Sequence, residues 1–287
     1  MAALVLPLSA ISPLPVQEAL AQEASVVATT TIAAETAAPA QQDVENPYGV
    51  TVNGAPMTTD PMLTVKDGVT YVSLRNVASA LVPGAQVSWN GSSAIIFKEG
   101  VLSLTAVPGQ EYIVANGRYL PTEGVMTQSG AVLVSLNTIV KATDATYAWQ
   151  ADGTLALTTG SGGILSAEQF YNADDLYWLS RIIYSESGNQ PLSGKIAVGN
   201  VVLNRVNSPR FPSTIHGVIF QRNQFSPAAN GTINRTPNAE SVMAAKLCLD
   251  GAVELDNVLW FNRAGLNSWA SRNRTFVATI AQHSFYA

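Results

Sequence analysis

The sequence predicts a multidomain α+β protein, with a β-rich N-terminal domain followed by a mainly α-helical C-terminal domain. The length of 287 residues exceeds that of a typical single domain and suits two. Apolar residues alternate as in strands up to about residue 158, and beyond residue 170 they recur at the spacing of helices. The glycine-rich run at residues 159–163 lies between these regions and marks a boundary.

The N-terminal segment predicts a protein that is exported from the cell. Residues 1–16 are small and apolar, and Ala19-Leu20-Ala21 follows them as an A-x-A processing pattern, although no Lys or Arg precedes Lys66. We therefore interpret 1–21 as a signal-peptide remnant; an Ala-rich disordered tail is the alternative. This segment is too short to span a bilayer, so no membrane span is expected after cleavage. Residues 22–47 contain few large apolar side chains, which predicts a disordered linker.

The charge differs between the two parts of the chain. Residues 1–170 hold 5 basic and 13 acidic side chains, whereas residues 171–287 hold 10 basic and 7 acidic ones. The mildly basic C-terminal part favours an anionic polymer as partner, with a solvated surface that binds nothing as the alternative. Basic runs interleaved with aromatic residues are missing, so nucleic acid is not expected as a partner. Oligomeric state is left open.

The chain has too few cysteines and histidines to predict a metal site or a disulfide. Cys248 is the single cysteine, and its apolar neighbours predict a buried structural thiol. His216 and His283 are the two histidines, too few for a zinc hydrolase, and no cofactor is expected.

Residues 48–158 contain an internal repeat. Three short motifs recur at offsets of 60 to 63 residues, and the pairs that define them are Asn53 and Asn116, Ser73 and Ser135, and Trp89 and Trp149. Each copy predicts a hairpin, a strand, a short helix (75–81 or 137–142) and a further strand, because Asn-Gly favours tight turns.

This repeat resembles the copper amine oxidase N-terminal-like stalk domain. The resemblance depends on the motif Gly68-Val69-Thr70-Tyr71-Val72-Ser73-Leu74-Arg75 and on the later Trp89. It implies a spacer or a wall-contact module over residues 48–158, followed by a linker over 159–170. No copper site is expected, since the stretch has neither His nor Cys.

One acidic residue, Glu186, falls within an apolar helix face. Asp174 and Asp175 are expected to cap this helix, and Gly188 is expected to end it. At 100° per residue, Glu186 lies in the middle of the stripe formed by Leu179, Ile182 and Ile183. Burial and the negative end of the helix dipole would both raise the pKa of Glu186, as a general acid requires. The alternative is a frayed last turn that leaves Glu186 in water.

The C-terminal region, residues 171–287, resembles the SleB/CwlJ-type cell wall hydrolases. The blocks that carry the resemblance are Ile182–Pro191, Gly194–Val206, Phe211–Ile215, Gly217–Ile219, Gln224–Ser226 and His283–Tyr286. The resemblance implies a domain similar to lysozyme and lytic transglycosylases that cuts the bond between N-acetylmuramic acid and N-acetylglucosamine in peptidoglycan glycan strands. The family acid falls on Glu186. A second Glu that is frequent in the family is replaced here by Gln190.

Two further segments are candidates for the sugar-binding cleft. Aromatic faces stack on sugar rings, and amides read N-acetyl and hydroxyl groups through hydrogen bonds. The candidate substrate-binding residues are Gln224, Phe225, Ser226, Trp260, Phe261 and Asn262. Ordinary core packing is the alternative for the aromatic members of this set.

Two more helices are expected to build the core of this domain. The segment 194–207 is apolar nearly all round, and Gly199 is expected to let another helix approach closely. Thr236 and Pro237 are expected to begin a helix that Gly251 ends. Asn204 and Arg205 are expected to hold loops rather than substrate.

The absence of an evident second inward carboxylate favours a lytic transglycosylase, which needs one acid/base residue, over a hydrolase that uses two. An N-acetylmuramoyl-L-alanine amidase and a non-catalytic cell-wall-binding protein are the alternatives. The expected location is outside the cell, in the wall; vegetative wall and spore cortex both stay open as substrates.

Overall fold

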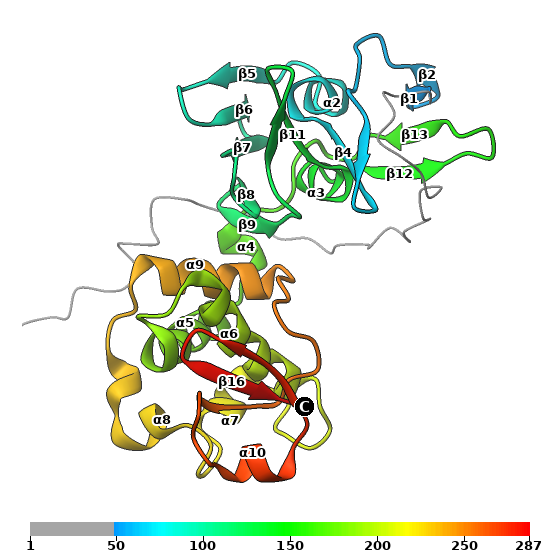
Figure 1. Cartoon of the computed structure of the whole chain (residues 1–287). Helices are drawn as coiled ribbons and strands as arrows, with labels where there is room; N and C mark the ends of the chain where they lie inside the picture. Colours follow the sequence, from blue (N-terminus) through cyan, green and yellow to red (C-terminus); the bar gives the residue numbers. More distant parts are fainter. Residues whose placement is uncertain (1–48) are drawn as a thin grey trace, which may run out of the picture.

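A computed structural model describes residues 49–287, and the expected signal remnant and most of the expected linker lie outside the described residues. The described part forms two domains, each with its own hydrophobic core. The N-terminal core extends from Val50 to Leu157, and the C-terminal core extends from Ala167 to Phe285. Figure 1 shows the β-rich domain above the helical one. The predicted order of a β-rich and a helical domain is confirmed.

The internal repeat is present as two matching sets of elements. The first copy consists of β1 (Val50–Val52), β2 (Ala55–Pro56), β3 (Thr64–Lys66), β4 (Val69–Ser73), α2 (Leu74–Leu81), β5 (Gln86–Trp89) and β6 (Ala94–Lys98). The second consists of β8 (Tyr112–Ala115), β9 (Arg118–Pro121), β10 (Met126–Gln128), β11 (Ala131–Ser135), α3 (Leu136–Ala142), β12 (Thr146–Trp149) and β13 (Leu155–Thr158). The extra strand β7 (Leu102–Ala106) joins the two copies.

The two copies meet through antiparallel pairing of β4 with β11, in a sheet of order β10-β11-β4-β3. The other sheets have the orders β5-β6-β7-β8-β9 and β12-β13-β1-β2. The Asn-Gly turns adopt positive φ at both residues, 53° and 82° at Asn53 and Gly54, as a tight hairpin requires. Ser73 and Ser135 cap the two short helices by accepting hydrogen bonds from backbone N–H groups.

The C-terminal domain is built around three helices that contact one another, α5 (Ala173–Ser187), α6 (Leu192–Val206) and α9 (Ala239–Leu249). Shorter helices surround them: α4 (Ala167–Phe170), α7 (Ile215–Ile219), α8 (Ser226–Asn230), the 3-10 helix η1 (Thr232–Asn234) and α10 (Trp269–Asn273). Gly199 of α6 is a close-contact point, because a Cβ there would lie 2.5 Å from the Cys248 Sγ and 3.1 Å from the Ile183 Cδ1. The expected role of Gly199 is confirmed.

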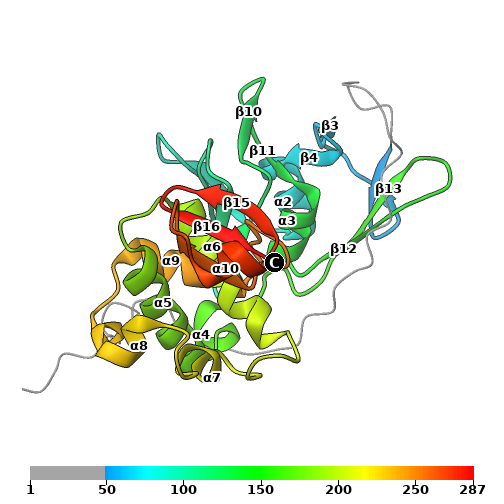
Figure 2. The ribbon, with the colours of Figure 1, turned by 60° about the horizontal axis from the view of Figure 1, so that its bottom comes forward.

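The sequence did not predict a three-stranded sheet that completes this domain. It has the order β14-β16-β15, with β14 at Trp260–Arg263, β15 at Phe276–Ile280 and β16 at His283–Tyr286. These strands are short and do not alternate cleanly between apolar and polar residues, so their periodicity was weak. The sheet packs on α6 through β14 and β15, and Figure 2 shows it in front of that helix.

Two helix starts differ from the predicted ones. Asn172 caps α5, with its side-chain oxygen accepting hydrogen bonds from the N–H groups of Asp174 and Asp175 at 2.9 and 3.1 Å. The expected caps Asp174 and Asp175 are thus in the first turn, where their charges still favour the helix dipole. Asn238, and not Thr236, caps α9 by accepting a 2.9 Å hydrogen bond from the Ser241 N–H. Asn, Asp and Thr all favour the N-cap position, so the sequence offers several caps close together at each of these helix starts and does not distinguish them.

The glycine run between the domains is packed against the N-terminal domain. A Cβ at Gly160 would lie 1.6 Å from the Asp144 carbonyl oxygen, and one at Gly163 would lie 2.1 Å from that of Val101. Asn116 donates a 2.6 Å hydrogen bond to the carbonyl of Ile164 just beyond. These glycines therefore permit close backbone contact, whereas the sequence suggested that they provide flexibility.

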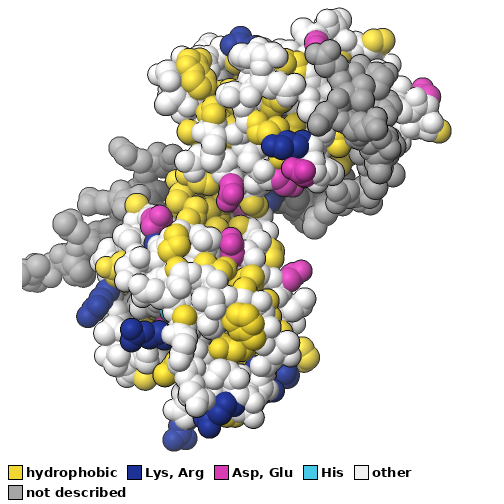
Figure 3. Space-filling view, in the orientation of Figure 1, with side chains coloured by type: hydrophobic (Ala, Val, Ile, Leu, Met, Phe, Trp, Pro, Cys, Tyr) yellow, Lys and Arg dark blue, Asp and Glu magenta, His cyan; other side chains and the backbone are white. Residues whose placement is uncertain are grey.

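The two domains meet where α9 contacts β9, and Figure 1 shows α4 and α9 at this junction. In Figure 3 the basic side chains of the C-terminal domain lie mainly away from the junction, and acidic side chains lie nearer to it. Among residues 49–287, no helix is both long and apolar enough to cross a bilayer.

Candidate active site

Glu186 lies in the last turn of α5, on the face that this helix turns toward the core. Leu179, Ile182 and Ile183 on the same face are fully buried, whereas Glu186 is half-buried. Gly188 is the C-terminal cap, and its N–H donates to the Tyr184 carbonyl. The expected helix end is therefore confirmed. Among residues 49–287, no donor makes a hydrogen bond to the Glu186 carboxylate.

Burial raises the pKa of Glu186 to about 7, from an ordinary value of 4.5. Desolvation disfavours the charged carboxylate and is the cause of the raised pKa. No positive charge contributes to lower the pKa again. Near neutral pH a large fraction of Glu186 is therefore protonated, so this side chain can both donate and accept a proton.

A pocket of about 370 Å³ adjoins the last turn of α5, which carries Glu186, but Glu186 itself is not among the residues that line the pocket. Its lining residues are Tyr184, Ser185, Gly188, Asn189, Thr232, Arg235 and Asn238. The Ser185 hydroxyl donates a 3.4 Å hydrogen bond to the Thr232 carbonyl and so ties α5 to η1. Sequence reasoning missed Thr232, Arg235 and Asn238. The sequence offers one signal for this wall of the pocket: Asn230-Gly231 favours a turn, and polar residues follow it.

The loop after Glu186 is fixed by a buried lysine. The Lys195 Nζ donates to the Gln190 carbonyl and also lies 2.6 Å from the Glu240 carboxylate on α9. The Gln190 side chain is buried, and its Oε1 accepts a 3.1 Å hydrogen bond from the Gln282 N–H. Gln190 therefore holds the β15–β16 turn, and at this position the amide has a structural role.

The remaining carboxylates of the C-terminal domain are each accounted for. Asp250 is buried in an ion pair with Arg118, and Glu240 is paired with Lys195. Asp174 and Asp175 lie at the opposite end of α5, roughly 16 Å or more along the helix from Glu186 at 1.5 Å per residue. The others, Glu254 and Asp256, are exposed in the segment between α9 and β14.

The first candidate cleft segment does not line the pocket but lies at the start of α8, which contacts η1 at the pocket wall. Phe225 caps α8, which contacts η1 and α5, so this segment lies near the end of the helix that carries Glu186. Gln224 and Ser226 are exposed, whereas Phe225 is only 4% exposed and packs in the core, 6.3 Å from the Phe261 ring.

The second candidate segment is strand β14, whose side chains alternate between two faces. Phe261 packs on Phe285 at a ring distance of 5.9 Å and belongs to the core side. On the other side, Trp260 lies 6.2 Å from the exposed Trp269, with the Arg274 guanidinium 4.3 Å from its ring centre. The structure therefore separates Phe261 from Trp260.

The Asn262 amide is engaged within the protein. Its oxygen accepts a 2.6 Å hydrogen bond from the Ser268 hydroxyl, and its nitrogen donates to the Arg263 carbonyl at 2.7 Å. Arg205 and Asn204 of α6 hold the start of the same strand by donating to the carbonyls of Leu259 and Val258 at 2.7 and 3.1 Å.

No three His, Cys, Asp or Glu side chains of residues 49–287 are grouped as metal ligands would be. His216 is stacked on Phe220, and His283 contacts the Phe261 ring, so both histidines lie among aromatic side chains. Cys248 is buried, and burial raises the pKa of its thiol to about 12, which keeps it protonated and unreactive.

Comparison with known families assigns this region. The sequence pattern of the family described as Cell Wall Hydrolase matches residues 189–286, a stretch that begins just after the helix carrying Glu186. The C-terminal domain therefore belongs to the cell wall hydrolase family, a family of enzymes. The matched stretch includes the pocket residues Thr232, Arg235 and Asn238 and the whole C-terminal sheet of this domain.

Curated relatives of the cell wall hydrolase domain are spore cortex-lytic enzymes. The chain is 34% identical over 116 residues to the spore cortex-lytic enzyme of Bacillus cereus. This match covers 40% of this chain and 45% of the relative. The chain is 32% identical over 128 residues to that of Oceanobacillus iheyensis, covering 44% and 46%. The chain thus spans less than half the length of these relatives.

Among solved structures, the catalytic domain of the germination-specific lytic transglycosylase SleB from Bacillus anthracis is 32% identical in sequence. The match covers 41% of this chain and 97% of that structure, with a TM-score of 0.39. The N-terminal region, residues 51–157, matches the family described as Copper amine oxidase N-terminal domain. That region contains neither His nor Cys, so it lacks the usual copper ligands, and no copper chemistry is derived from it.

Proposed function

We propose that this protein is an exported lytic transglycosylase of the cell wall. It cuts the β-1,4 bond between N-acetylmuramic acid and N-acetylglucosamine in peptidoglycan, with Glu186 as acid and then base, in a domain of lysozyme-like architecture. The observation that carries the proposal is a half-buried carboxyl group with a pKa near 7 in a helix turn whose neighbouring residues line a pocket, in a domain of the cell wall hydrolase family. The relatives are named as spore cortex-lytic enzymes and as a lytic transglycosylase, which supports the same substrate class.

The proposed reaction uses one side chain in two protonation states. Protonated Glu186 donates its proton to the glycosidic oxygen while the bond from that oxygen to the muramic C1 breaks. The Glu186 carboxylate then accepts the proton of the muramic 6-hydroxyl as O6 bonds to C1. One product ends in a free 4-hydroxyl and the other in a 1,6-anhydro ring, no water is consumed, and Glu186 ends protonated.

The surroundings of Glu186 favour this route over a two-carboxylate hydrolysis. Retaining and inverting glycosidases need a second carboxylate about 5 to 9.5 Å from the first. Gln190 carries an amide where the family often carries an acid, and Glu240 is paired with the buried Lys195. A pKa near 7 also suits a group that must donate and later recover a proton at neutral pH.

Substrate binding is proposed for the polar wall that leads from the pocket to α8. Gln224 and Ser226 are exposed and offer an amide and a hydroxyl to sugar substituents. Arg235 lines the pocket and adds a positive charge for the carboxylates of the peptide-bearing sugars. Trp260 remains a candidate stacking surface farther along, whereas Phe225, Phe261 and Asn262 support these surfaces from within.

The test is product analysis with purified sacculi. Digestion by the parent chain should release muropeptides that end in 1,6-anhydro-muramic acid, detected by mass spectrometry as a loss of water relative to reducing ends. Glu186→Gln should abolish release while sacculi are still bound. Glu254→Gln is the matched control. Partial desolvation also raises the pKa of Glu254, but its side chain is exposed and lies on another segment, so this variant should remain active.

Three outcomes would count against the proposal. Reducing muramic ends without anhydro product would indicate hydrolysis, and release of stem peptides would indicate an amidase. Binding of sacculi by the parent chain without any cleavage would indicate a wall-binding protein.

A further inference from the structure

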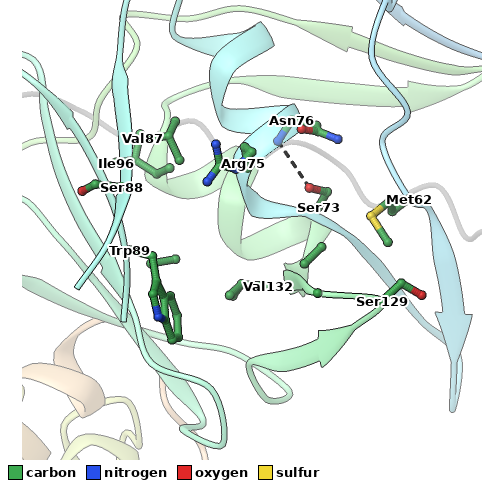
Figure 4. Close-up of a pocket in the computed structure, with 13 residues that line it drawn as sticks. Met62, Ser73, Arg75, Asn76, Val87, Ser88, Trp89, Ile96, Ser129 and Val132 are labelled. Atoms are coloured by element: carbon green, nitrogen blue, oxygen red, sulfur yellow. Dashed lines mark hydrogen bonds between the residues drawn. The ribbon is translucent and has the colours of Figure 1, made fainter. Parts of the chain in front are cut away.

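The N-terminal domain carries a pocket of its own, remote from Glu186 in the sequence and built mainly from the first repeat copy, with one wall from the β10–β11 turn of the second. It has a volume of about 260 Å³ and lies between the start of α2, the β5–β6 hairpin and the turn that joins β10 to β11. Figure 4 shows Arg75 from α2 and Trp89 from the end of β5 at this pocket, with Val132 across from them. Ser73 fixes its inner edge by accepting a hydrogen bond from the Asn76 N–H.

Trp89 gives the pocket an exposed aromatic face. The side chain is 50% exposed, and no other aromatic ring of residues 49–287 stacks on it. Exposed indoles at the rim of a concave site are typical of binding surfaces, because they bury much apolar area on contact while their N–H remains free to donate.

Arg75 gives the same pocket its only charge. It is the single charged residue among the 13 that line the site. Arg75 is exposed, and within residues 49–287 its guanidinium has neither an ion pair nor a hydrogen bond. A guanidinium with five unused donors beside an apolar face recognises a planar anion such as a carboxylate.

The second repeat copy shows that this pocket is not a general product of the fold. At the positions equivalent to Arg75 and Val87, offset by 62 and 60 residues, the second copy has Asn137 and Tyr147. The Tyr147 hydroxyl donates a 2.7 Å hydrogen bond to the Asn137 side chain and so links the helix to the strand. The first copy lacks this link, and its helix and strand present Arg75 and an open pocket instead.

We propose that this pocket binds peptidoglycan at a second site, with a pyranose ring stacked on Trp89 and a carboxylate of the attached lactyl-peptide on Arg75. The inference rests on the proposed function for its choice of polymer. The pocket is smaller than the roughly 300 to 1,000 Å³ that enclose a whole drug-sized ligand, which suits one ring of a longer strand. Binding here would hold the chain on its substrate between cuts, since two linked sites raise the effective concentration.

Nuclear magnetic resonance of the Glu186→Gln chain tests the site directly. The chain has five tryptophans, and the Trp89 indole N–H signal is assigned by its loss in Trp89→Phe. Soluble muropeptides should shift this signal, while the Trp149 signal of the second copy stays in place. Chitotetraose, which lacks a carboxylate, should bind about tenfold more weakly, a difference of about 1.4 kcal/mol. Arg75→Ala should remove that difference.

Sedimentation with sacculi measures the binding of matched variants, all made in the same Glu186→Gln chain. Trp89→Ala should weaken binding by about tenfold, as expected for a central contact residue, and Trp89→Phe should retain most of it. Phe97→Ala and Lys66→Ala are the controls, and both should bind like the parent. Phe97 is 45% exposed on β6 and points to the opposite face of the hairpin from Ile96, which lines the pocket.

The two proposals fail in different ways. A Trp89→Ala chain that binds sacculi as tightly as the parent overturns the second site, whether or not the parent cleaves. A Trp89 signal that moves with teichoic acid but not with muropeptides would also overturn it. A parent that fails to cleave, but whose binding depends on Trp89 and Arg75, contradicts the catalytic proposal and supports the second site.

Discussion

Arg118 of β9 and Asp250 at the end of α9 form a buried, two-point ion pair that joins the two domains. Their side chains are 2% and 0% exposed. Lys141 lies 3.3 Å from the same carboxylate, the Tyr171 hydroxyl donates to it, and the Phe170 ring covers the guanidinium at 3.3 Å. One acidic side chain of the catalytic domain therefore holds two cations of the N-terminal domain, which fixes the orientation of one domain on the other.

Replacing Asp250 by Ala should separate the domains or unfold the junction. The change leaves Arg118 buried without a counter-charge, which typically costs about 3 to 5 kcal/mol. Chemical denaturation should show a lower free energy of unfolding, and limited proteolysis should cut between residues 159 and 172. Asp256→Ala, an exposed acid nearby in the sequence, is the control and should change little.

A double replacement separates the charge effect from the packing effect. Arg118→Met combined with Asp250→Leu removes both buried charges, so most of the lost stability should return. If the double variant is as unstable as Asp250→Ala alone, the ion pair is not what holds the junction.

The rate of glycan cleavage should fall as the pH rises through about 7. In the proposed reaction Glu186 must be protonated in the free enzyme to act first as acid, and burial raises its pKa to about 7. Below pH 6 the rate constant kcat/KM should be nearly independent of this group, and above pH 8 it should drop about tenfold per unit. A profile that instead rises with pH over this range would mean that Glu186 acts first as a base.

The stability of the folded chain should depend on the protonation of Glu186 and should decrease as the pH rises. The unfolded pKa is near 4.5 and the folded one about 7, so the folded state binds the extra proton. The stability that this proton confers is fully present below pH 4.5 and is lost as the pH rises through 7. Glu186→Gln, which carries no charge, should therefore be more stable than the parent at pH 8, by up to about 3 kcal/mol, and equal to it at pH 4. Thermal unfolding at the two pH values measures the difference, and equal midpoints at pH 8 would show that Glu186 is solvated.

Much of this architecture could be predicted from local patterns. The repeat was visible because Asn53 and Asn116 need positive φ and because Ser73 and Ser135 cap equivalent helices. Glu186 was visible because a single helix wheel places it among apolar residues. These features depend on residues that lie close together in the chain.

The parts that could not be predicted depend on distant residues. Arg118 and Asp250 are 132 positions apart, and neither has a local pattern that marks it as buried. The pocket wall at Thr232 and Arg235 is formed only when η1 packs on α5. Trp260 and Phe261 looked equivalent in the sequence, and only the pairing of β14 with β16 assigns them to opposite faces.

Any side chain at Gly199 should destabilise the domain, because a Cβ there would clash with Cys248. A second substitution at Cys248 should relieve part of this clash. In Gly199→Ala the new methyl would lie 2.5 Å from the Cys248 Sγ, so either the buried thiol must turn away or α6 and α9 must move apart, at a cost of about 1 to 3 kcal/mol. Removing that sulfur in Gly199→Ala with Cys248→Ala should recover part of the loss, although the Ile183 Cδ1 at 3.1 Å remains. A double-mutant cycle by chemical denaturation should therefore give a favourable coupling energy of about 0.5 kcal/mol or more. Strict additivity of the two single changes would show that the backbone, and not the thiol, limits the approach of these helices.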